Sequence, residues 1–159
     1  MGDEAFYDFL DDNIAIESHP VDYVNDPAVI AQNDNVVSVN STIEMDLTGA
    51  CNSEYVRGHQ FTSTGGQLDF VRGAYASKGG ISFIAFQSSI KGGKISKIVP
   101  RLSGPVTTPR TDVHYVVTEN GVANLKGLSS TERAYALIGL ADPAFRGELT
   151  TAAKESHLI

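Results

Sequence analysis

The sequence of 159 residues has little cysteine, no long apolar run and few basic residues. Its single cysteine, Cys51, cannot form an internal disulfide, so we expect a reduced protein of the cytoplasm. A nucleophilic thiol needs a base close by. We therefore expect Cys51 to be a small buried side chain and not a nucleophile.

No apolar run approaches the roughly 20 residues of a membrane-spanning helix, which predicts no membrane contact. The acidic N-terminus, residues 1–12, also lacks the basic start and apolar stretch of a signal peptide. Twelve Lys and Arg against nineteen Asp and Glu give a net charge of -7, and the basic residues are scattered. Because nucleic acid is bound by a basic stripe, the charge argues against that partner. A small anionic ligand responds to local charge and is not excluded.

Several motifs of catalysis and metal binding are also absent. There is no HExxH or CxxC pair, so no metal site is predicted. No GxSxG nucleophile elbow, Walker loop or full dinucleotide fingerprint occurs. The histidines lack metal-ligand spacing, and a structural role is favoured for each of His19, His59, His114 and His157. His59 is the best functional candidate among them, because a glycine pair follows it closely.

What is present predicts one α/β domain over residues 1–159, with 1–20 as a lead-in segment. Helix starts are indicated by an apolar spacing within 3–12, by Asp26-Pro27 and Asp142-Pro143, by a glycine pair before residue 67 and by a capping box at 129–132. Apolar patterns predict strands within 37–47, 81–86, 95–99 and 113–117. Because strands and helices alternate, we expect an open, mainly parallel sheet with flanking helices.

Residues 37–47 alternate between apolar and polar side chains, which predicts extended chain with one wet face, as one bent strand or two. Glu44 and Asp46 lie two positions apart and so point to the same side. Paired carboxylates can divide into acid and base roles. A half-buried strand also turns polar residues to solvent without any catalytic purpose, and that interpretation is favoured.

Two glycine-containing turns could bind an anion. Gly65 and Gly66 precede a predicted helix, where free N–H groups and the helix dipole suit a phosphate, a carboxylate or an oxyanion. A plain loop-to-helix turn explains the same residues and is favoured on spacing alone. The basic turn KGGK at 91–94 could hold a phosphate or simply make a hairpin soluble, and the residues do not decide between the two.

Six motifs occur together in a specific order. They are DYVNDP at 22–27, VNSTIEMDLTG at 39–49, GGQLDFVRGA at 65–74, KGGKISKIVP at 91–100, VVTENGVA at 116–123 and ERA at 132–134. On these motifs the chain resembles the C-terminal part of the acetyl-CoA hydrolase/4-hydroxybutyrate CoA-transferase family, from about residue 5 to its end. Six ordered motifs make the resemblance far more specific than any one of them.

The resemblance implies the second half of a two-domain CoA-transferase, in which each half is an open α/β sheet and the active site lies between the halves. The family's enzymes move coenzyme A between an acyl-CoA and a free carboxylate. The implied route is covalent catalysis by a glutamate, through an acyl-glutamyl anhydride and then a glutamyl-CoA thioester that a second carboxylate resolves. Each step passes through an oxyanion that must be stabilised.

The resemblance also implies roles for residues of this chain. Asn25 matches an active-site asparagine whose amide bonds the reacting carboxylate or oxyanion, and Gly66 matches the glycine whose backbone N–H completes that site. Lys91 matches a lysine that meets the anionic CoA. The implied contacts with CoA are Gly65, Gly66, Lys91, Ile43 and Thr62, and no metal is implied.

The family's nucleophilic glutamate lies upstream of the Asn-x-Pro motif, in a segment not found in this sequence, and Glu44 does not match its position. We therefore expect the isolated chain to be inactive, and either to pair with a missing N-terminal half or to form a homodimer. The sequence does not decide which acid accepts CoA or whether the activity is that of a transferase or a hydrolase. It also leaves open whether the short chain is a truncation, a split subunit or a natural fragment. Two alternatives are a non-catalytic α/β module that binds phosphate or CoA, and an inactive fragment that dimerises through an exposed face.

Overall fold

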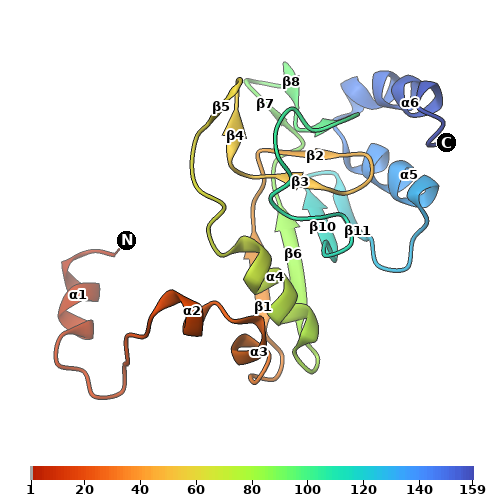
Figure 1. Ribbon diagram of the computed structural model, residues 1–159. Coiled ribbons are helices and arrows are strands. Elements are labelled where there is room, and N and C mark those ends of the chain that lie inside the picture. The colour runs from red at the N-terminus through yellow and green to blue at the C-terminus, as the bar shows by residue number, and fades with distance from the viewer. Residues whose placement is uncertain (1) are drawn as a thin grey trace.

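A computed structural model describes residues 2–159 and shows an α/β body with a projecting N-terminal arm (Figure 1). The arm carries α1 (Glu4–Leu10), whose first turn is capped by Asp3 through a bond from the Phe6 N–H at 3.0 Å. None of the residues of α1 is buried. The predicted helix within 3–12 is confirmed, and its aromatic side chains remain in solvent.

A four-stranded sheet organises the body. Its strands are β1 (Val37–Asn40), β6 (Ile81–Ala85), β10 (Tyr115–Thr118) and β11 (Gly121–Asn124), and they lie in that order. The first three strands run parallel, and β11 closes the sheet as the antiparallel arm of a hairpin. The predicted open and mainly parallel sheet is confirmed.

A smaller sheet has the order β3 (Cys51–Asn52), β2 (Glu44–Asp46) and β9 (Ile98–Val99). Two short hairpins accompany it, β4 (Tyr55–Val56) with β5 (His59–Gln60), and β7 (Ser89–Ile90) with β8 (Ile95–Ser96). Residues 37–47 thus form two strands in different sheets. The prediction of one strand over 95–99 is wrong, because the carbonyl of Lys97 turns to accept from the Met45 N–H and divides the segment between a hairpin and the small sheet.

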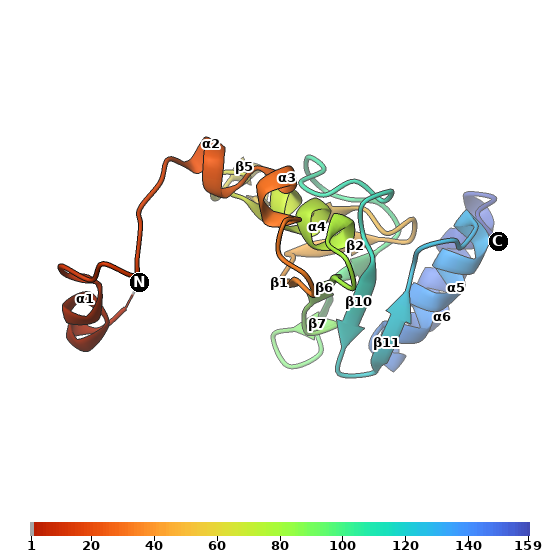
Figure 2. The same ribbon diagram turned by 90° about the horizontal axis from the view of Figure 1, so that it is seen from below.

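Helices cover one face of the main sheet (Figure 2). The short helices α2 (Val21–Val24) and α3 (Pro27–Ile30) lead to β1, and α4 (Gln67–Ala76) packs on β1 and β6. The C-terminal part contains α5 (Ser130–Leu140), the 3-10 turn η1 (Pro143–Phe145) and α6 (Arg146–Glu155). Ser129 and Glu132 form the predicted capping box of α5, and Asp142 accepts from the Ala144 N–H at 3.0 Å.

The alternation of β1 is the reverse of the one expected. Ser38 is buried, whereas Val37 and Val39 are exposed, so the predicted wet polar face is wrong for this strand. The parallel register sets Ser38 beside Ser82, which is also buried, and α4 lies over the pair. Two small side chains let the helix approach the sheet closely, and the larger valines therefore occupy the other face.

The core lies between the helices, the covered face of the main sheet and the small sheet. Its fully buried members come from every layer: Met45, Leu47, Val71, Ile84, Ile98, Val113, Val116, Leu125 and Leu137. The core also holds polar atoms. The Ser82 hydroxyl has no hydrogen-bond partner within residues 2–159, whereas the equally buried Ser88 donates to Glu119 and accepts from the Asn120 amide at 3.1 Å.

The two buried serines predict opposite responses to substitution by alanine. Ser82→Ala removes an unsatisfied hydroxyl and should leave the free energy of unfolding unchanged or raise it by up to about 1 kcal/mol. Ser88→Ala removes hydrogen bonds to Glu119 and Asn120, which are exposed and keep the Ser88 N–H and the Leu140 carbonyl as partners, and should lower the free energy of unfolding by about 0.5–1.5 kcal/mol. Urea unfolding of both variants tests the pair, and equal losses would contradict the assignment.

Candidate functional site

The turn into α4 brings together two residues that are far apart in the sequence. Gly65 has a φ of 59°, in the left-handed region, and Gly66 is the N-cap of α4. The side-chain amide of Asn25 lies against Gly66, since a Cβ placed on Gly66 would be 2.3 Å from Asn25 Nδ2. Glycine at position 66 is therefore what allows the Asn25 amide to sit there.

The Gly66 N–H donates to no acceptor in the part of the chain that the structure describes. It belongs to the start of α4, where unpaired N–H groups and the helix dipole give a partial positive charge. One amide N–H from a side chain and one from the backbone thus lie together. This is a donor arrangement that suits a carbonyl oxygen acquiring negative charge.

The start of α4 is fixed to the core by a side-chain contact. Gln67 Nε2 donates to Thr108 Oγ1 at 3.0 Å, and Thr108 bridges to Cys51, whose N–H donates to the Thr108 carbonyl at 3.0 Å. On the other side of α4, the Ile30 side chain packs against Gly73. A Cβ added to Gly73 would lie 2.6 Å from the Cβ of Ile30. These two contacts set the position of Gly66 and of the segment that carries Asn25.

A cavity of about 370 Å³ opens beside Asn25. It is lined by Val21, Asp22, Asn25, Asp26, Pro27 and Asp69. Asp26 is occupied as the cap of α3, where it accepts from the Ala28 N–H at 2.8 Å. The three carboxylates oppose the attraction of the helix start for an anion, so a ligand here is best held by hydrogen bonds to its carbonyl oxygen.

A second cavity, of about 470 Å³, lies between the two hairpins. It contains two of the predicted residues, Ile43 and Lys91, and three further basic side chains that the sequence analysis did not assign to CoA: Arg57, His59 and Lys97. Its apolar wall consists of Tyr55, Val56, Phe61, Ile90 and Ile95. A basic rim with an apolar wall suits a ligand that joins an anionic part to an apolar part.

The two basic turn residues of this cavity adopt the left-handed backbone region. Lys91 has a φ of 54° and Arg57 has a φ of 51°, each at the tip of a hairpin and each followed by a glycine. A side chain in this region costs roughly 1 kcal/mol relative to glycine. Neither residue forms a salt bridge within residues 2–159, so their charges are free to meet a ligand.

Lys97 is the half-buried cation of the same cavity. Burial lowers the pKa of its ammonium group, and its Nζ lies 5.2 Å from the centre of the Phe86 ring.

The sequence gives only a weak signal for these extra cations. Arg57-Gly58 could have been recognised as a hairpin turn of the Asn-Gly kind, but nothing in the sequence places it opposite Lys91.

Thr62 lies on the segment that joins β5 to the glycine turn, between the two groups of predicted residues (Figure 1). It is exposed, and its N–H donates to the Glu54 carbonyl at 3.2 Å. It lines neither of the two cavities. The predicted residues thus form two clusters, one at Asn25 and Gly66 and one at Ile43 and Lys91.

The paired carboxylates hold loops and are not free. Glu44 Oε1 accepts from the Ser103 N–H at 2.6 Å and from the Asn52 amide at 2.9 Å. Asp46 Oδ1 accepts from the N–H and the hydroxyl of Thr48. Both residues are half-buried, so neither the acid–base pair nor the freely solvated face describes them. Glu44 fixes the segment at Ser103 beside the hairpin cavity, and Asp46 fixes the turn between β2 and β3.

Cys51 is fully buried, and burial raises the pKa of its thiol to about 12. It therefore stays a neutral thiol, as the prediction of a small buried side chain required. Within residues 2–159, no cluster of three or more His, Cys, Asp or Glu side chains could hold a metal ion, and no helix is long and apolar enough to cross a membrane.

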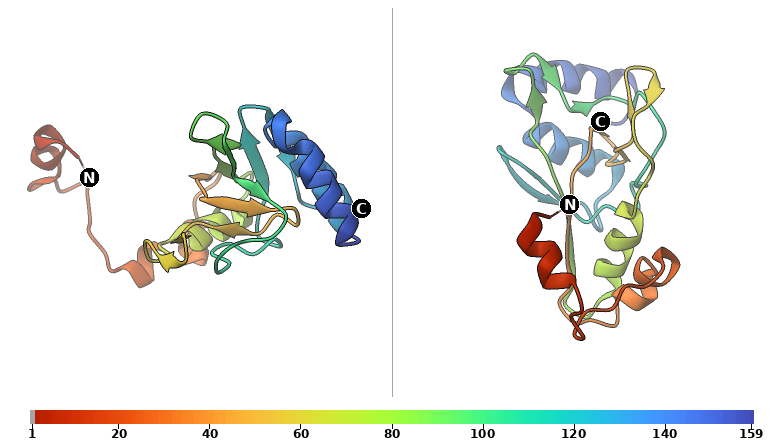
Figure 3. Two further views of the ribbon diagram at one scale, coloured as in Figure 1. Left: turned by 90° about the horizontal axis from the view of Figure 1, so that it is seen from above. Right: turned by 90° about the vertical axis from the view of Figure 1, so that its left-hand side faces the viewer.

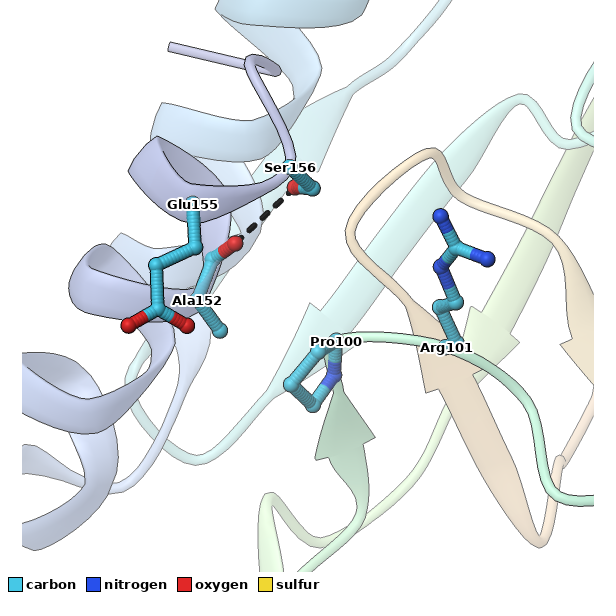
Figure 4. Close-up of a pocket in the computed structure, with 5 residues that line it drawn as sticks. All are labelled: Pro100, Arg101, Ala152, Glu155 and Ser156. Atoms are coloured by element: carbon cyan, nitrogen blue, oxygen red, sulfur yellow. Dashed lines mark hydrogen bonds between the residues drawn. The ribbon is translucent and has the colours of Figure 1, made fainter.

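Another cavity, of about 530 Å³, contains none of the predicted residues. It is a shallow depression between the segment after β9 and the end of α6 (Figure 4). Arg101 and Glu155 extend in different directions from its two sides, and Ser156 donates to the Ala152 carbonyl at 2.9 Å. No convergent set of polar groups occurs there, so it is not the candidate site.

Comparison with known proteins decides the family. The profile of the acetyl-CoA hydrolase/transferase C-terminal domain matches residues 2–153. The chain belongs to this family. This confirms the resemblance on which the site residues were chosen, although the role of each residue is still a prediction.

Among curated relatives, the domain is 52% identical over its whole length to the succinyl-CoA:cyclohexane-1-carboxylate CoA transferase of Geobacter metallireducens and covers 37% of that protein. It is 50% identical over 94% of its length to the 4-hydroxybutyrate coenzyme A transferase of Clostridium kluyveri and covers 35% of it. The crystal structure of RipA from Yersinia pestis superimposes on the whole domain with a TM-score of 0.94 at 65% identity, and 36% of that chain is covered. The domain thus spans about a third of the length of these relatives.

The two adjacent glycines predict distinct effects of substitution. Gly66→Ala fits the backbone but pushes away the Asn25 amide, so the side-chain amide signals of Asn25 should shift in a ¹H–¹⁵N spectrum while stability changes little. Gly65→Ala meets open space but strains the backbone, so it should lower the free energy of unfolding by about 1 kcal/mol and leave the Asn25 signals in place. Identical behaviour of the two variants would contradict this geometry.

Proposed function

We propose that this domain is the CoA-binding and oxyanion-stabilising part of an acyl-CoA:carboxylate CoA-transferase of the 4-hydroxybutyrate CoA-transferase type. The observation that carries the proposal is the contact of the Asn25 amide with Gly66, the N-cap residue of α4. Relatives at 50% identity and above are named as CoA transferases, which supports the same reaction class.

In the proposed reaction, a glutamate carboxylate from the part of the enzyme outside this chain attacks the thioester carbonyl of the acyl-CoA. The C–S bond breaks, CoA leaves as a thiolate, and an acyl-glutamyl anhydride remains. The thiolate then attacks the glutamyl carbonyl and expels the first carboxylate, which leaves a glutamyl-CoA thioester. An incoming carboxylate then attacks the glutamyl-CoA carbonyl and releases the CoA thiolate, which leaves a new acyl-glutamyl anhydride. The thiolate attacks the acyl carbonyl of this anhydride, so that the new acyl-CoA departs and the glutamate is restored.

Asn25 and Gly66 act on the oxyanion that forms in each step. The Asn25 amide lies against Gly66, so both residues could donate to one oxygen, and donors that are already in place are the condition for effective electrostatic stabilisation. Gly65 permits the ligand to come close to the backbone at this turn. No metal is needed, because hydrogen bonds supply the stabilisation.

Coenzyme A is assigned to the hairpin cavity, with Thr62 and the segment 61–66 leading from there to the glycine turn. Lys91 and Arg57 would meet its phosphates, and Ile43 with the apolar wall would meet its less polar portion. Because the domain as a whole carries a net charge of -7, this local group of cations is what makes an anionic ligand favourable.

The partner substrate is a small carboxylate, and the missing catalytic group comes from the region that precedes this domain in the family. We place the reaction in the cytoplasm, consistent with a single, buried and unpaired cysteine. Hydrolysis of the acyl-CoA would follow the same route with water in place of the acceptor carboxylate.

The CoA assignment predicts a specific pattern in calorimetric titration of the purified domain. CoA should bind, ADP less tightly, and inorganic phosphate more weakly still, since phosphate reaches only the basic rim. Lys91→Ala should weaken CoA binding about five- to tenfold, the equivalent of roughly 1 kcal/mol for one charged contact.

Lys94→Ala is the matched control, because Lys94 is an exposed lysine of the same hairpin turn that does not line the cavity. It should bind CoA like the unaltered domain. Equal losses in both variants would reduce the effect to general charge. Binding of phosphate as tight as that of CoA would favour a simple phosphate-binding module instead.

We further predict that the isolated chain, titrated with acetyl-CoA and butyrate, shows no turnover above the buffer rate. The reason is the absence of the family's nucleophilic glutamate from its motifs. Mass spectrometry of the incubated chain should also reveal no covalent glutamyl-CoA adduct. Steady formation of butyryl-CoA by a homogeneous preparation would overturn this part of the proposal.

A further inference from the structure

Lys97 is held differently from the other cations of the hairpin cavity. Its N–H donates to the Ser88 carbonyl at 2.8 Å, and its carbonyl accepts from the Met45 N–H at 2.9 Å. These two bonds close the root of the β7–β8 hairpin and tie it to β2, the central strand of the small sheet. Lys91 and Arg57 instead lie at the tips of the two short hairpins, which stand apart at one end of the body (Figure 3). The cavity thus has one cation fixed at a hairpin root and two at hairpin tips.

The ammonium group of Lys97 is half-buried and has no anionic partner. Its Nζ lies 5.2 Å from the centre of the Phe86 ring, and no salt bridge within residues 2–159 includes it. Glu44 lines the same cavity, but its Oε1 already accepts from the Ser103 N–H and hydroxyl and from the Asn52 amide. Burial without an anion disfavours the charged form, and the pKa of Lys97 is accordingly lowered. A bound anion would offset this cost.

The anion that suits this position best is a phosphate monoester. The attraction between two groups grows with the product of their charges, and a phosphate monoester carries about −1.5 to −2 at neutral pH, more than a phosphate diester or a carboxylate. Coenzyme A contains both kinds of phosphate. Its ribose bears a 3′-phosphate monoester, and a pyrophosphate diester joins the ribose to the pantetheine arm. The backbone of Lys97 is fixed on both sides, so the phosphate that it binds has a fixed place in the cavity.

We infer that Lys97 binds the 3′-phosphate of CoA and makes this domain prefer CoA over 3′-dephospho-CoA. The assignment rests on the proposed function, which places CoA in the hairpin cavity. The pyrophosphate, which continues into the pantetheine arm, is left to Lys91 and Arg57 at the hairpin tips. A Lys97 that only packs on the Phe86 ring would give no dependence on the 3′-phosphate, so the two roles of this side chain are separable by measurement.

The experiment is calorimetric titration of the chain with CoA and with 3′-dephospho-CoA. The unaltered chain should bind CoA about tenfold more tightly, the ratio expected for one charged contact. Lys97→Met keeps an unbranched apolar stem on Phe86 and removes the charge, so it should bind the two ligands equally. Lys97→Arg restores the charge and should restore a preference for CoA. Equal affinities of the unaltered chain for the two ligands would overturn the inference, whatever the variants do.

Two other lysines of the same hairpin serve as comparisons. Lys91→Ala should weaken the binding of both ligands by the same factor, because Lys91 is assigned to the pyrophosphate that they share. Lys94→Met is the matched control, since Lys94 is exposed and does not line the cavity, and it should leave both affinities unchanged. A preference for CoA that is lost in Lys94→Met or Lys91→Ala as fully as in Lys97→Met would contradict the assignment, because general charge would then explain it.

The results separate the inference from the proposed function. Binding of both ligands with equal affinity, weakened in Lys91→Ala, would keep the CoA role of the domain and refute the role of Lys97. Binding of neither ligand by the unaltered chain would refute the CoA role and the role of Lys97 with it. Urea unfolding of Lys97→Met, expected to match that of the unaltered chain, shows that a lost preference for CoA is not a lost fold.

Discussion

The seating of α4 on the β1–β6 pair is the contact on which the rest of the structure depends. Ser38 and Ser82 lie side by side beneath the helix, and their small size sets how closely it approaches the sheet. On its outer side α4 receives Ile30 at Gly73, which fixes α3 and the segment that leads back to Asn25. Asn25 and Gly66, the proposed oxyanion donors, are therefore positioned by the sheet through a single helix, and Gln67 anchors the N-terminal end of that helix.

Much of the fold could be read from local signals in the sequence. The caps at Asp26, Ser129 and Asp142 each hold the predicted helix start, because a capping side chain acts within one turn and needs no tertiary context. The short apolar run 81–86 predicts a strand, and β6 forms there, although only the face that carries Ser82 and Ile84 is buried. The division of 95–99 between two sheets could not be read, since it depends on the carbonyl of Lys97 meeting β2 from elsewhere in the chain.

The reversed alternation of β1 shows a different limit. Periodicity indicates that two faces differ, but it does not indicate which one a helix will cover. Here the polar face is buried, because its residues are small and α4 needs the space, and the valines are exposed on the opposite face. For the site, the family motifs selected Asn25 and Gly66, and the structure adds the contact between them. Arg57 and Lys97 were missed because the folding of two hairpins around one cavity leaves no trace in sequence spacing.

The two hairpins that enclose the basic cavity have strands of only two residues each. Ribbons this short are barely stable by themselves in water, so each can shift relative to the other with little resistance. A ligand that bridges Arg57 on one tip and Lys91 on the other would act as a cross-link between them. Part of its binding energy is then spent on ordering the protein, and the measured affinity understates the quality of the contacts. In the proposed function, CoA would complete the shape of this cavity as it orders the two hairpins.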